Sequence, residues 1–247
     1  MNILLLAICF FAGTGAWFIS TVAAGGAAML LLPTLGLFIT ADILIPAVSL
    51  AALTANPTRA WTFRQHIHWP VVSWLVPGSI LGALIGTWVF SQLEPFWIQL
   101  VLAIFLISTL WQFRFGKRKK SFPMPLWGFF PLGLIVAGIS GVAGGTGPVQ
   151  NPFLLNRGLE KEQLVASKAI NSLALQATKI IGYTAFGAMT NNVWIMGLTM
   201  GAGAIAGILL AKKHLLNITD DRFRKYTLMM MPICGVVMLV KLFIERS

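Results

Sequence analysis

The chain has 247 residues, of which 57% are hydrophobic and 10% are charged, and it carries a formal net charge of +11. A soluble domain has about 25% charged residues, so this composition excludes a water-soluble globule, whose surface needs more polar side chains. The net positive charge alone would also suit a nucleic-acid-binding protein. Its densest run, Lys117–Lys120, however, lies between apolar segments and is typical of a cytoplasmic loop of a membrane protein.

Long apolar segments predict transmembrane helices along most of the chain. About 20 apolar residues cross the roughly 30 Å core of a bilayer as a helix, whereas barrel strands would alternate over about ten residues. The segments expected in the first half are 3–23, a short 27–39, 43–63 with an interruption at Asn56-Pro57, 70–90 and 96–113. Those of the second half are 125–143, a short 147–156, 162–187, 193–211 and 226–244. Because no basic region precedes it, we expect the first segment to be a retained helix rather than a cleaved signal peptide.

The two halves have the same order of segments, and matching residues recur at constant spacing. Gly25, Gly26 and Pro33 are followed 119 residues later by Gly144, Gly145 and Pro152, and Gly78 and Gly82 are followed 125 residues later by Gly203 and Gly207. Internal repeats are frequent in membrane transporters. The predicted fold is an all-α polytopic transmembrane protein of two inverted repeats, each with a Gly/Pro-broken segment plus three long helices. The repeats are residues 1–113 and 125–247, and a basic cytoplasmic linker, 114–124, joins them.

The positions of Lys and Arg predict the orientation. If each half makes an odd number of passages, Arg64, the linker, Arg157 and the Lys212-to-Lys225 cluster share one side of the membrane. Asp42 and Glu94 then lie on the other side. Because cytoplasmic loops carry an excess of Lys and Arg, we expect both termini on the outer side.

Two short Gly-rich segments that end in proline are the strongest sequence indication of a binding site. They read STVAAGGAAMLLLP at 20–33 and SGVAGGTGPVQNP at 140–152. Glycine lets the backbone leave helical geometry, proline ends the preceding helix, and a helix that starts at such a break directs its N–H groups toward an anion. The alternative is close packing of helices on small residues.

Intramembrane lysines are the second indication. Lys168 and Lys179 lie eleven residues apart in the predicted helix 162–187, which is about three turns, so they share a face. Ionisable residues inside a membrane are costly and mark functional sites. Apart from Glu162 at the first position of 162–187, the long spans contain no carboxylate, which suits an anionic substrate. Snorkelling of the cations toward helix ends is the alternative. The secondary candidates near these positions are Asn56, Arg59, Asn171, Ser172 and Gln176.

Other features leave little room for catalysis. The sequence contains no GxxxxGK[ST] loop, no HExxH, no convincing Ser-His-Asp set and no cysteine cluster, so we expect no ATP hydrolysis, enzyme activity, cofactor, metal or nucleic-acid partner. His66 and His68, at the expected inner boundary, suit either proton coupling or plain loop positions.

The motifs resemble those of the sulfite exporter TauE/SafE family, also called the toluene sulfonate uptake permease family. The resemblance rests on GGTGPVQNPFLL at 144–155, on the Gly-Gly segment ending in Pro33, and on KIIGY at 179–183. In the first repeat, Ala27 and Ala28 stand where the family often has glycine. The resemblance implies a multi-pass permease of the bacterial inner (plasma) membrane that moves small sulfur-containing anions such as sulfite or organosulfonates. It also implies a functional intramembrane lysine, here Lys179.

Together, these patterns predict a secondary transporter, an exporter in the main interpretation, whose partners are a small anion and the lipid bilayer. A passive anion channel and a non-transporting membrane scaffold subunit are the alternatives. The choice of anion, the direction, the coupling ion and a homo-oligomeric state are left open. The residues expected to bind the anion are Gly25, Gly26, Gly144, Gly145, Thr146, Gly147, Gln150, Asn151 and Lys179.

Overall fold

The computed structural model describes residues 3–22, 26–36, 38–94, 96–97, 100, 124–215, 236 and 240. These residues form helices and no strand, as the apolar segments predicted. The spans expected at 96–113 and 226–244 and the linker 114–124 lie almost entirely outside the described residues. The elements are α1 (Ile3–Val22), α2 (Ala27–Leu35), α3 (Ala41–Thr62), η1 (Arg64–His66), α4 (Trp69–Gln92), η2 (Leu126–Gly128), α6 (Phe129–Ala143), η3 (Gly147–Gln150), α7 (Asn151–Asn156), α8 (Lys161–Ala185) and α9 (Asn191–Leu215).

Four stretches of the described chain are long and apolar enough to cross a membrane. They are α1, α4, Leu126–Ala143 and Asn191–Lys212, with mean hydropathies of 1.5 to 2.1. The helices α3 and α8 are as long, 22 and 25 residues, but carry more polar side chains. They pack against each other, α3 also against α9 and α8 also against α4. Helices surrounded by other helices can hold polar groups that lipid would not tolerate.

The expected interruption at Asn56-Pro57 is wrong, because α3 continues through both Pro46 and Pro57. A proline in a transmembrane helix removes one hydrogen bond, but neighbouring helices and local adjustment satisfy the freed backbone group. The true breaks lie elsewhere, between α1 and α2 and between α6 and α7.

Glycines allow two equivalent helix pairs to pack with their backbones in contact. In the pair α4–α6, a Cβ on Gly82 would collide with the carbonyl oxygen of Leu134. In the pair α9–α1, a Cβ on Gly207 would collide with the carbonyl oxygen of Thr14. The two glycines are the residues that align at a spacing of 125 in the sequence. Each of these pairs joins one helix from the first half of the chain to one helix from the second half.

The turns between helices gather at two opposite ends of the molecule. At the first end, Phe63, Phe129 and Leu159 belong to one buried cluster. There the N–H of His68 donates to Ser167 Oγ at 2.9 Å, and Arg157 donates to the Met124 carbonyl at 3.3 Å. The turns at 63–68, 124–128 and 157–160 therefore lie together.

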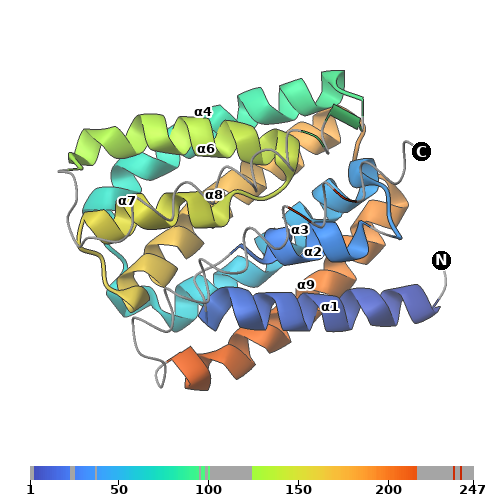
Figure 1. The fold of residues 1–247 in the computed structure, drawn as a ribbon, viewed down its shortest axis with the longest axis horizontal. Helices are drawn as coiled ribbons and strands as arrows, with labels where there is room; N and C mark the ends of the chain where they lie inside the picture. The colour runs from blue at the N-terminus through green and yellow to red at the C-terminus, as the bar shows by residue number, and fades with distance from the viewer. Residues whose placement is uncertain are drawn as a thin grey trace.

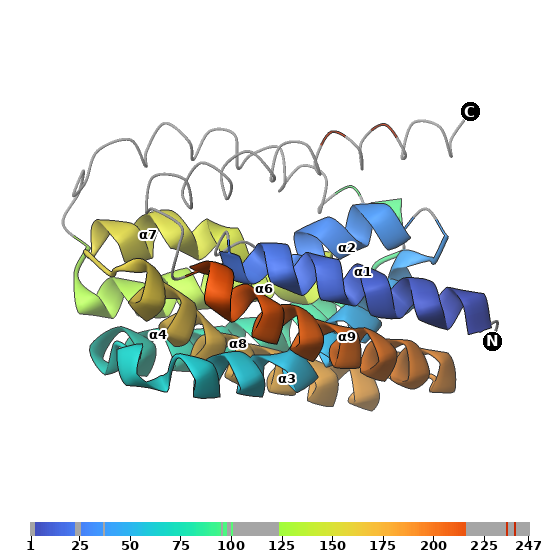
Figure 2. The same ribbon diagram turned by 90° about the horizontal axis from the view of Figure 1, so that it is seen from below.

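The two broken segments approach from opposite ends. The chain from η2 through α6 and α7 starts and finishes at the first end, since Arg157 contacts Met124. At the other end, α2 leads into the start of α3, near the start of α1 (Figure 1). Figures 1 and 2 both place α7 toward one end of the long axis and α2 toward the other. The breaks themselves therefore meet near the middle.

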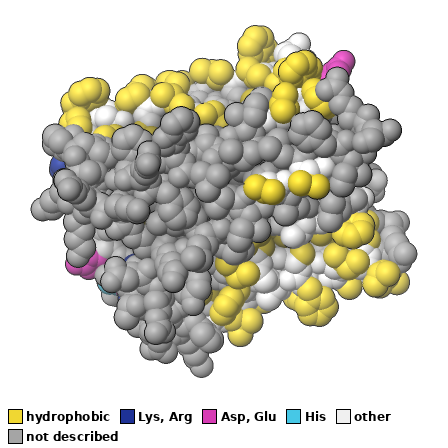
Figure 3. Space-filling model, viewed as in Figure 1, with side chains coloured by type: hydrophobic (Ala, Val, Ile, Leu, Met, Phe, Trp, Pro, Cys, Tyr) yellow, Lys and Arg dark blue, Asp and Glu magenta, His cyan; other side chains and the backbone are white. Residues whose placement is uncertain are grey.

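Apolar side chains dominate the visible described surface between the two ends, and the few charged ones in view lie near the ends (Figure 3). Ile85 and Trp88 of α4 and Leu198 of α9 are among the large exposed apolar residues. This distribution suits helices that face lipid along their length.

Candidate functional site

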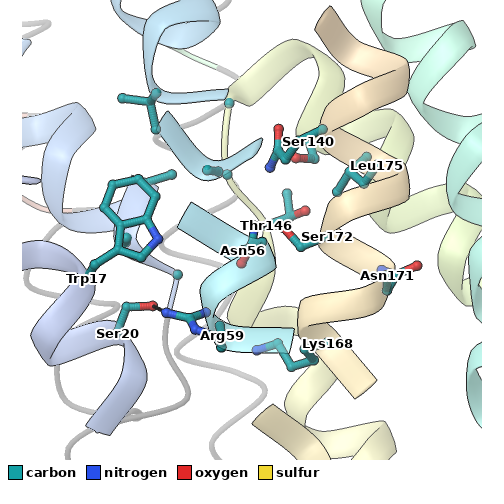
Figure 4. A pocket seen from close by; sticks show the side chains of 18 of the residues that line it. Trp17, Ser20, Asn56, Arg59, Ser140, Thr146, Lys168, Asn171, Ser172 and Leu175 are labelled. Carbon is teal, nitrogen blue, oxygen red and sulfur yellow. Dashed lines mark hydrogen bonds between the residues drawn. The ribbon is translucent and has the colours of Figure 1, made fainter. Parts of the chain in front are cut away.

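A pocket lies where the two breaks meet, between α1, α2, α3, α6 and α8 (Figure 4). Most residues that the sequence singled out line it. From the primary candidates these are Gly26, Gly144, Gly145, Thr146 and Gln150, and from the secondary ones Asn56, Arg59, Lys168, Asn171, Ser172 and Gln176. Gly147, Asn151 and Lys179 are not among the described lining residues, and Gly25 lies outside the described residues. The structure therefore brings together residues from both halves.

At Gly144 and Gly145, in the second break, a larger residue would be strained or would collide with its neighbours. Gly144 has a φ of +81°, a left-handed conformation that side chains disfavour, and ends α6. A Cβ on Gly145 would collide with the Cβ of Ala28, near the start of α2. The second break therefore packs directly against the first residues of α2.

Lys179 binds the backbone of the second break. Its ammonium group donates to the carbonyl oxygens of Ser140 at 3.0 Å and Gly144 at 3.2 Å, and the side chain is fully buried. One turn further along α8, the hydroxyl of Tyr183 donates to the Gly141 carbonyl at 2.7 Å. The Ser140 carbonyl also accepts from the Gly144 N–H at 2.9 Å. The last carbonyls of a helix generally lack helical donors, and these two side chains supply further ones at the end of α6.

Arg59 is the corresponding cation near the first break, but it faces the pocket. Its Nη2 donates to Ser20 Oγ at 3.5 Å (Figure 4) and to Thr21 Oγ1 at 2.8 Å. Its Nε is buried and has no hydrogen-bond partner among the described residues. The guanidinium therefore keeps a donor to offer.

Lys168 supplies a second cation to the same pocket. Its ammonium donates to Asn151 Oδ1 at 2.5 Å, which links α8 to the first residue of α7. Among the described residues that line the pocket, none is Asp or Glu. Arg59 comes from the first half of the chain and Lys168 from the second, so the pocket is lined by one cation from each.

Neutral polar groups complete the wall. Asn56 Nδ2 donates to Ser172 Oγ at 2.7 Å, which bridges α3 and α8. The side-chain oxygens of Asn171 and Gln176 are buried without a partner among the described residues. Because the oxygen and nitrogen of an amide are interchangeable by rotation, each of these groups can present a donor or an acceptor to a ligand.

The start of α2 also faces the pocket. Gly26, Ala27 and Ala28 line it, and Gly26 is the N-cap, with no side chain to cap the helix. The first backbone N–H groups of a helix have no helical partner and attract anions. The expected second half-helix differs, since α7 has only six residues, too few for a comparable helix dipole.

The lining residues that were absent from the sequence candidates include Trp17 and two serines, Ser20 and Ser140. The two serines end the equivalent helices α1 and α6, 120 residues apart, and both begin the Gly-rich segments. That recurrence was the signal available. Among the described residues, no group of three or more His, Cys, Asp or Glu could hold a metal ion.

Comparison with known proteins agrees with a membrane transporter. Over 157 residues, 57% of this chain and 51% of the relative, the chain is 32% identical to the probable membrane transporter protein YtnM of Bacillus subtilis (strain 168). It is 23% identical over 169 residues to the probable inner membrane transporter protein TsaS of Comamonas testosteroni, covering 66% of this chain and 68% of that one. The match spans about half the length of YtnM.

No solved structure matches the chain. The model of the family described as sulfite exporter TauE/SafE matches residues 9–238, which is most of the sequence. Together with the apolar helices, this match identifies a multi-pass membrane permease: the chain belongs to the TauE/SafE family of membrane transporters.

Proposed function

We propose that this permease is a secondary transporter, not an enzyme, that exports a small sulfur-containing anion such as sulfite or an organosulfonate across a bacterial inner membrane. The observation that carries the proposal is the pocket with Arg59 from α3 and Lys168 from α8, and no acidic residue among its described lining. The sulfur chemistry of the substrate is supported by the family description.

The anion would bind between the two breaks. Arg59 offers a planar guanidinium, which matches the oxygens of a sulfite or sulfonate group in pairs, and Lys168 offers a compact charge. The start of α2 adds backbone N–H groups, and the amides of Asn171 and Gln176 add adaptable polar contacts. Gln150 and Thr146 line the opposite side from the second break.

The alternating movement would come from two inverted repeats, residues 1–113 and 125–247. Two features support this arrangement: broken segments that approach from opposite ends, and equivalent glycine contacts in α4–α6 and α9–α1. Transporters with such repeats hold the substrate between the repeats near the membrane centre and rock one against the other.

The orientation would place the first end of the molecule in the cytoplasm. Arg64, Arg157 and Lys161 belong to this end, whereas Asp42 and Glu94 belong to the other. The excess of Lys and Arg in cytoplasmic loops supports this orientation, with the N-terminus on the periplasmic side.

Flux of radiolabelled sulfite in proteoliposomes tests the proposal. The wild type is compared with Arg59→Gln/Lys168→Gln and with a control that removes two cations at the first end but outside the pocket, Arg64→Gln/Lys161→Gln. We expect saturable flux in the wild type and control, and a loss of at least about tenfold in the pocket variant, because each cation contributes charged hydrogen bonds to the anion.

Other outcomes have distinct meanings. Flux that does not saturate would instead indicate a passive channel. Equal flux in wild type and pocket variant would remove the pocket from the path. Folded wild-type protein without flux of sulfite, sulfoacetate or toluenesulfonate would favour a scaffold subunit.

A further inference from the structure

Arg59 both lines the pocket and donates hydrogen bonds to the end of α1. It lies one turn before α3 ends at Thr62, and its side chain is partly exposed where it lines the pocket. Thr21, which accepts its hydrogen bond, is fully buried in the last turn of α1 and is not among the described lining residues. The guanidinium thus ties the last turn before the first break to α3.

The partners of Arg59 in this structure are weak ones for a cation. They are the neutral hydroxyls of Thr21, at 2.8 Å, and Ser20, at the long distance of 3.5 Å. A guanidinium has five N–H donors, and the buried Nε has no partner among the described residues. An anion adds Coulomb attraction and can accept two parallel N–H bonds from the guanidinium, whereas each hydroxyl is neutral and accepts singly. An anion in the pocket therefore competes favourably with the hydroxyls.

The end of α6, before the second break, has no such exchangeable contact. Lys179 and Tyr183 bind backbone carbonyls of α6, and both side chains are fully buried. Neither is among the described residues that line the pocket. Of the contacts that hold the end of a helix before a break, only that of Arg59 therefore faces the pocket. Lys168 also lines the pocket, but it holds the start of α7, through Asn151.

We propose that Arg59 is a substrate-operated latch: in the empty pocket it holds the end of α1 through Thr21, and the bound anion takes the guanidinium and releases that end. The inference rests on the proposed anion site and adds how binding is coupled to movement of one repeat. The hydroxyl of Thr21 then competes with the substrate for the guanidinium of Arg59, although Thr21 itself does not line the pocket.

Equilibrium binding of radiolabelled sulfite to the purified full-length protein tests the latch. Thr21→Val keeps the shape of the side chain but removes the acceptor, so it should tighten sulfite binding by about 2- to 10-fold, the range of one net hydrogen bond. Arg59→Lys keeps the charge but loses the planar fork, and should weaken binding by about tenfold. The control is Thr14→Val on the same helix. The hydroxyl of Thr14 donates to the Phe10 carbonyl one turn back, and this variant should bind sulfite as the wild type does.

A second readout follows the end of α1 itself. Hydrogen exchange of the backbone amides of 17–22 should become faster in the wild type when sulfite is added, and should already be fast in Thr21→Val without sulfite. Thr21→Val that binds sulfite as weakly as the wild type, or more weakly while folded, overturns the latch. So does slower exchange in the wild type on adding sulfite. If the wild type binds no sulfite, the anion site and the latch both fall.

Discussion

The two breaks occupy equivalent positions in the two halves, yet different chemistry holds them. In the second half, Lys179 and Tyr183 donate to three backbone carbonyls at the end of α6, all within a fully buried layer. In the first half, Arg59 donates to two side-chain hydroxyls at the end of α1, beside the pocket. A carbonyl at a buried helix end needs its donor, whereas a hydroxyl can turn to another partner. The comparison indicates that the end of α6 is fixed and that the end of α1 is adjustable.

Removing Lys179 should have the largest effect on stability, because its buried ammonium group holds the end of α6. Lys179→Ala should lower the free energy of unfolding by roughly 3–5 kcal/mol, through a cavity and the loss of two hydrogen bonds to buried carbonyls. Lys179→Met, which fills the space, separates the two causes. Thermal denaturation in detergent, followed by the loss of monodisperse protein, measures the effect.

The matched control is Lys161→Met, which removes a lysine from the partly exposed start of the same helix, where it pairs with Glu162 at 3.6 Å. It should leave stability nearly unchanged, since surface ion pairs contribute little. If Lys179→Met folds as well as the wild type but transports no anion, Lys179 belongs to the substrate path, as the sequence suggested.

The glycine contacts test whether the helix pairs α4–α6 and α9–α1 are equivalent. Gly82→Ala and Gly207→Ala should each lower the free energy of unfolding by about 2–3 kcal/mol, because a Cβ forces two helix backbones apart. Gly15→Ala, where a Cβ would meet nothing within 4 Å, should be neutral or slightly stabilising. Unequal losses at the first two positions, seen in the same denaturation assay, would break the equivalence of the helix pairs.

Lys168 tests the contribution of a cation that lines the pocket. Lys168→Gln should raise the half-saturating sulfite concentration in proteoliposomes by about tenfold, since it removes one charged hydrogen bond from the proposed site. The same change at Lys161 should leave that concentration unaltered. A fall in maximal rate alone, with the same half-saturating concentration, would assign Lys168 to positioning α7 through Asn151 instead.

The smallest expected effect belongs to Tyr183. Tyr183→Phe removes one hydrogen bond to the Gly141 carbonyl but keeps the ring against Phe90, whose centroid lies 5.0 Å away. The free energy of unfolding should fall by about 1 kcal/mol in the denaturation assay. Thr184→Val, which loses a hydroxyl exposed on the neighbouring position, is the control. Equal stability of Tyr183→Phe and wild type would leave Lys179 as the main donor to this break.

Much of the fold and most of the site could be predicted from sequence, because each depends on local pattern. Apolar runs located the described helices, and the glycines located the breaks between Val22 and Ala27 and between Ala143 and Asn151. The expectation that proline ends a helix was wrong at Pro33, which lies inside α2. Asn56-Pro57 failed as a predicted interruption, since the surrounding helices, and not the dipeptide, decide whether a proline ends a transmembrane helix.

The sequence by itself determined that this is a helical membrane protein with two Gly-rich breaks and a few cations inside its helices. Helical periodicity places Lys168 and Lys179 on one face of α8, but it does not say what each side chain contacts. Only the tertiary structure decided that Lys168 meets the pocket while Lys179 meets the carbonyls of α6. The physical reason is that a period of 3.6 residues gives the direction of a side chain, but its partners depend on which helix packs there, and at what height.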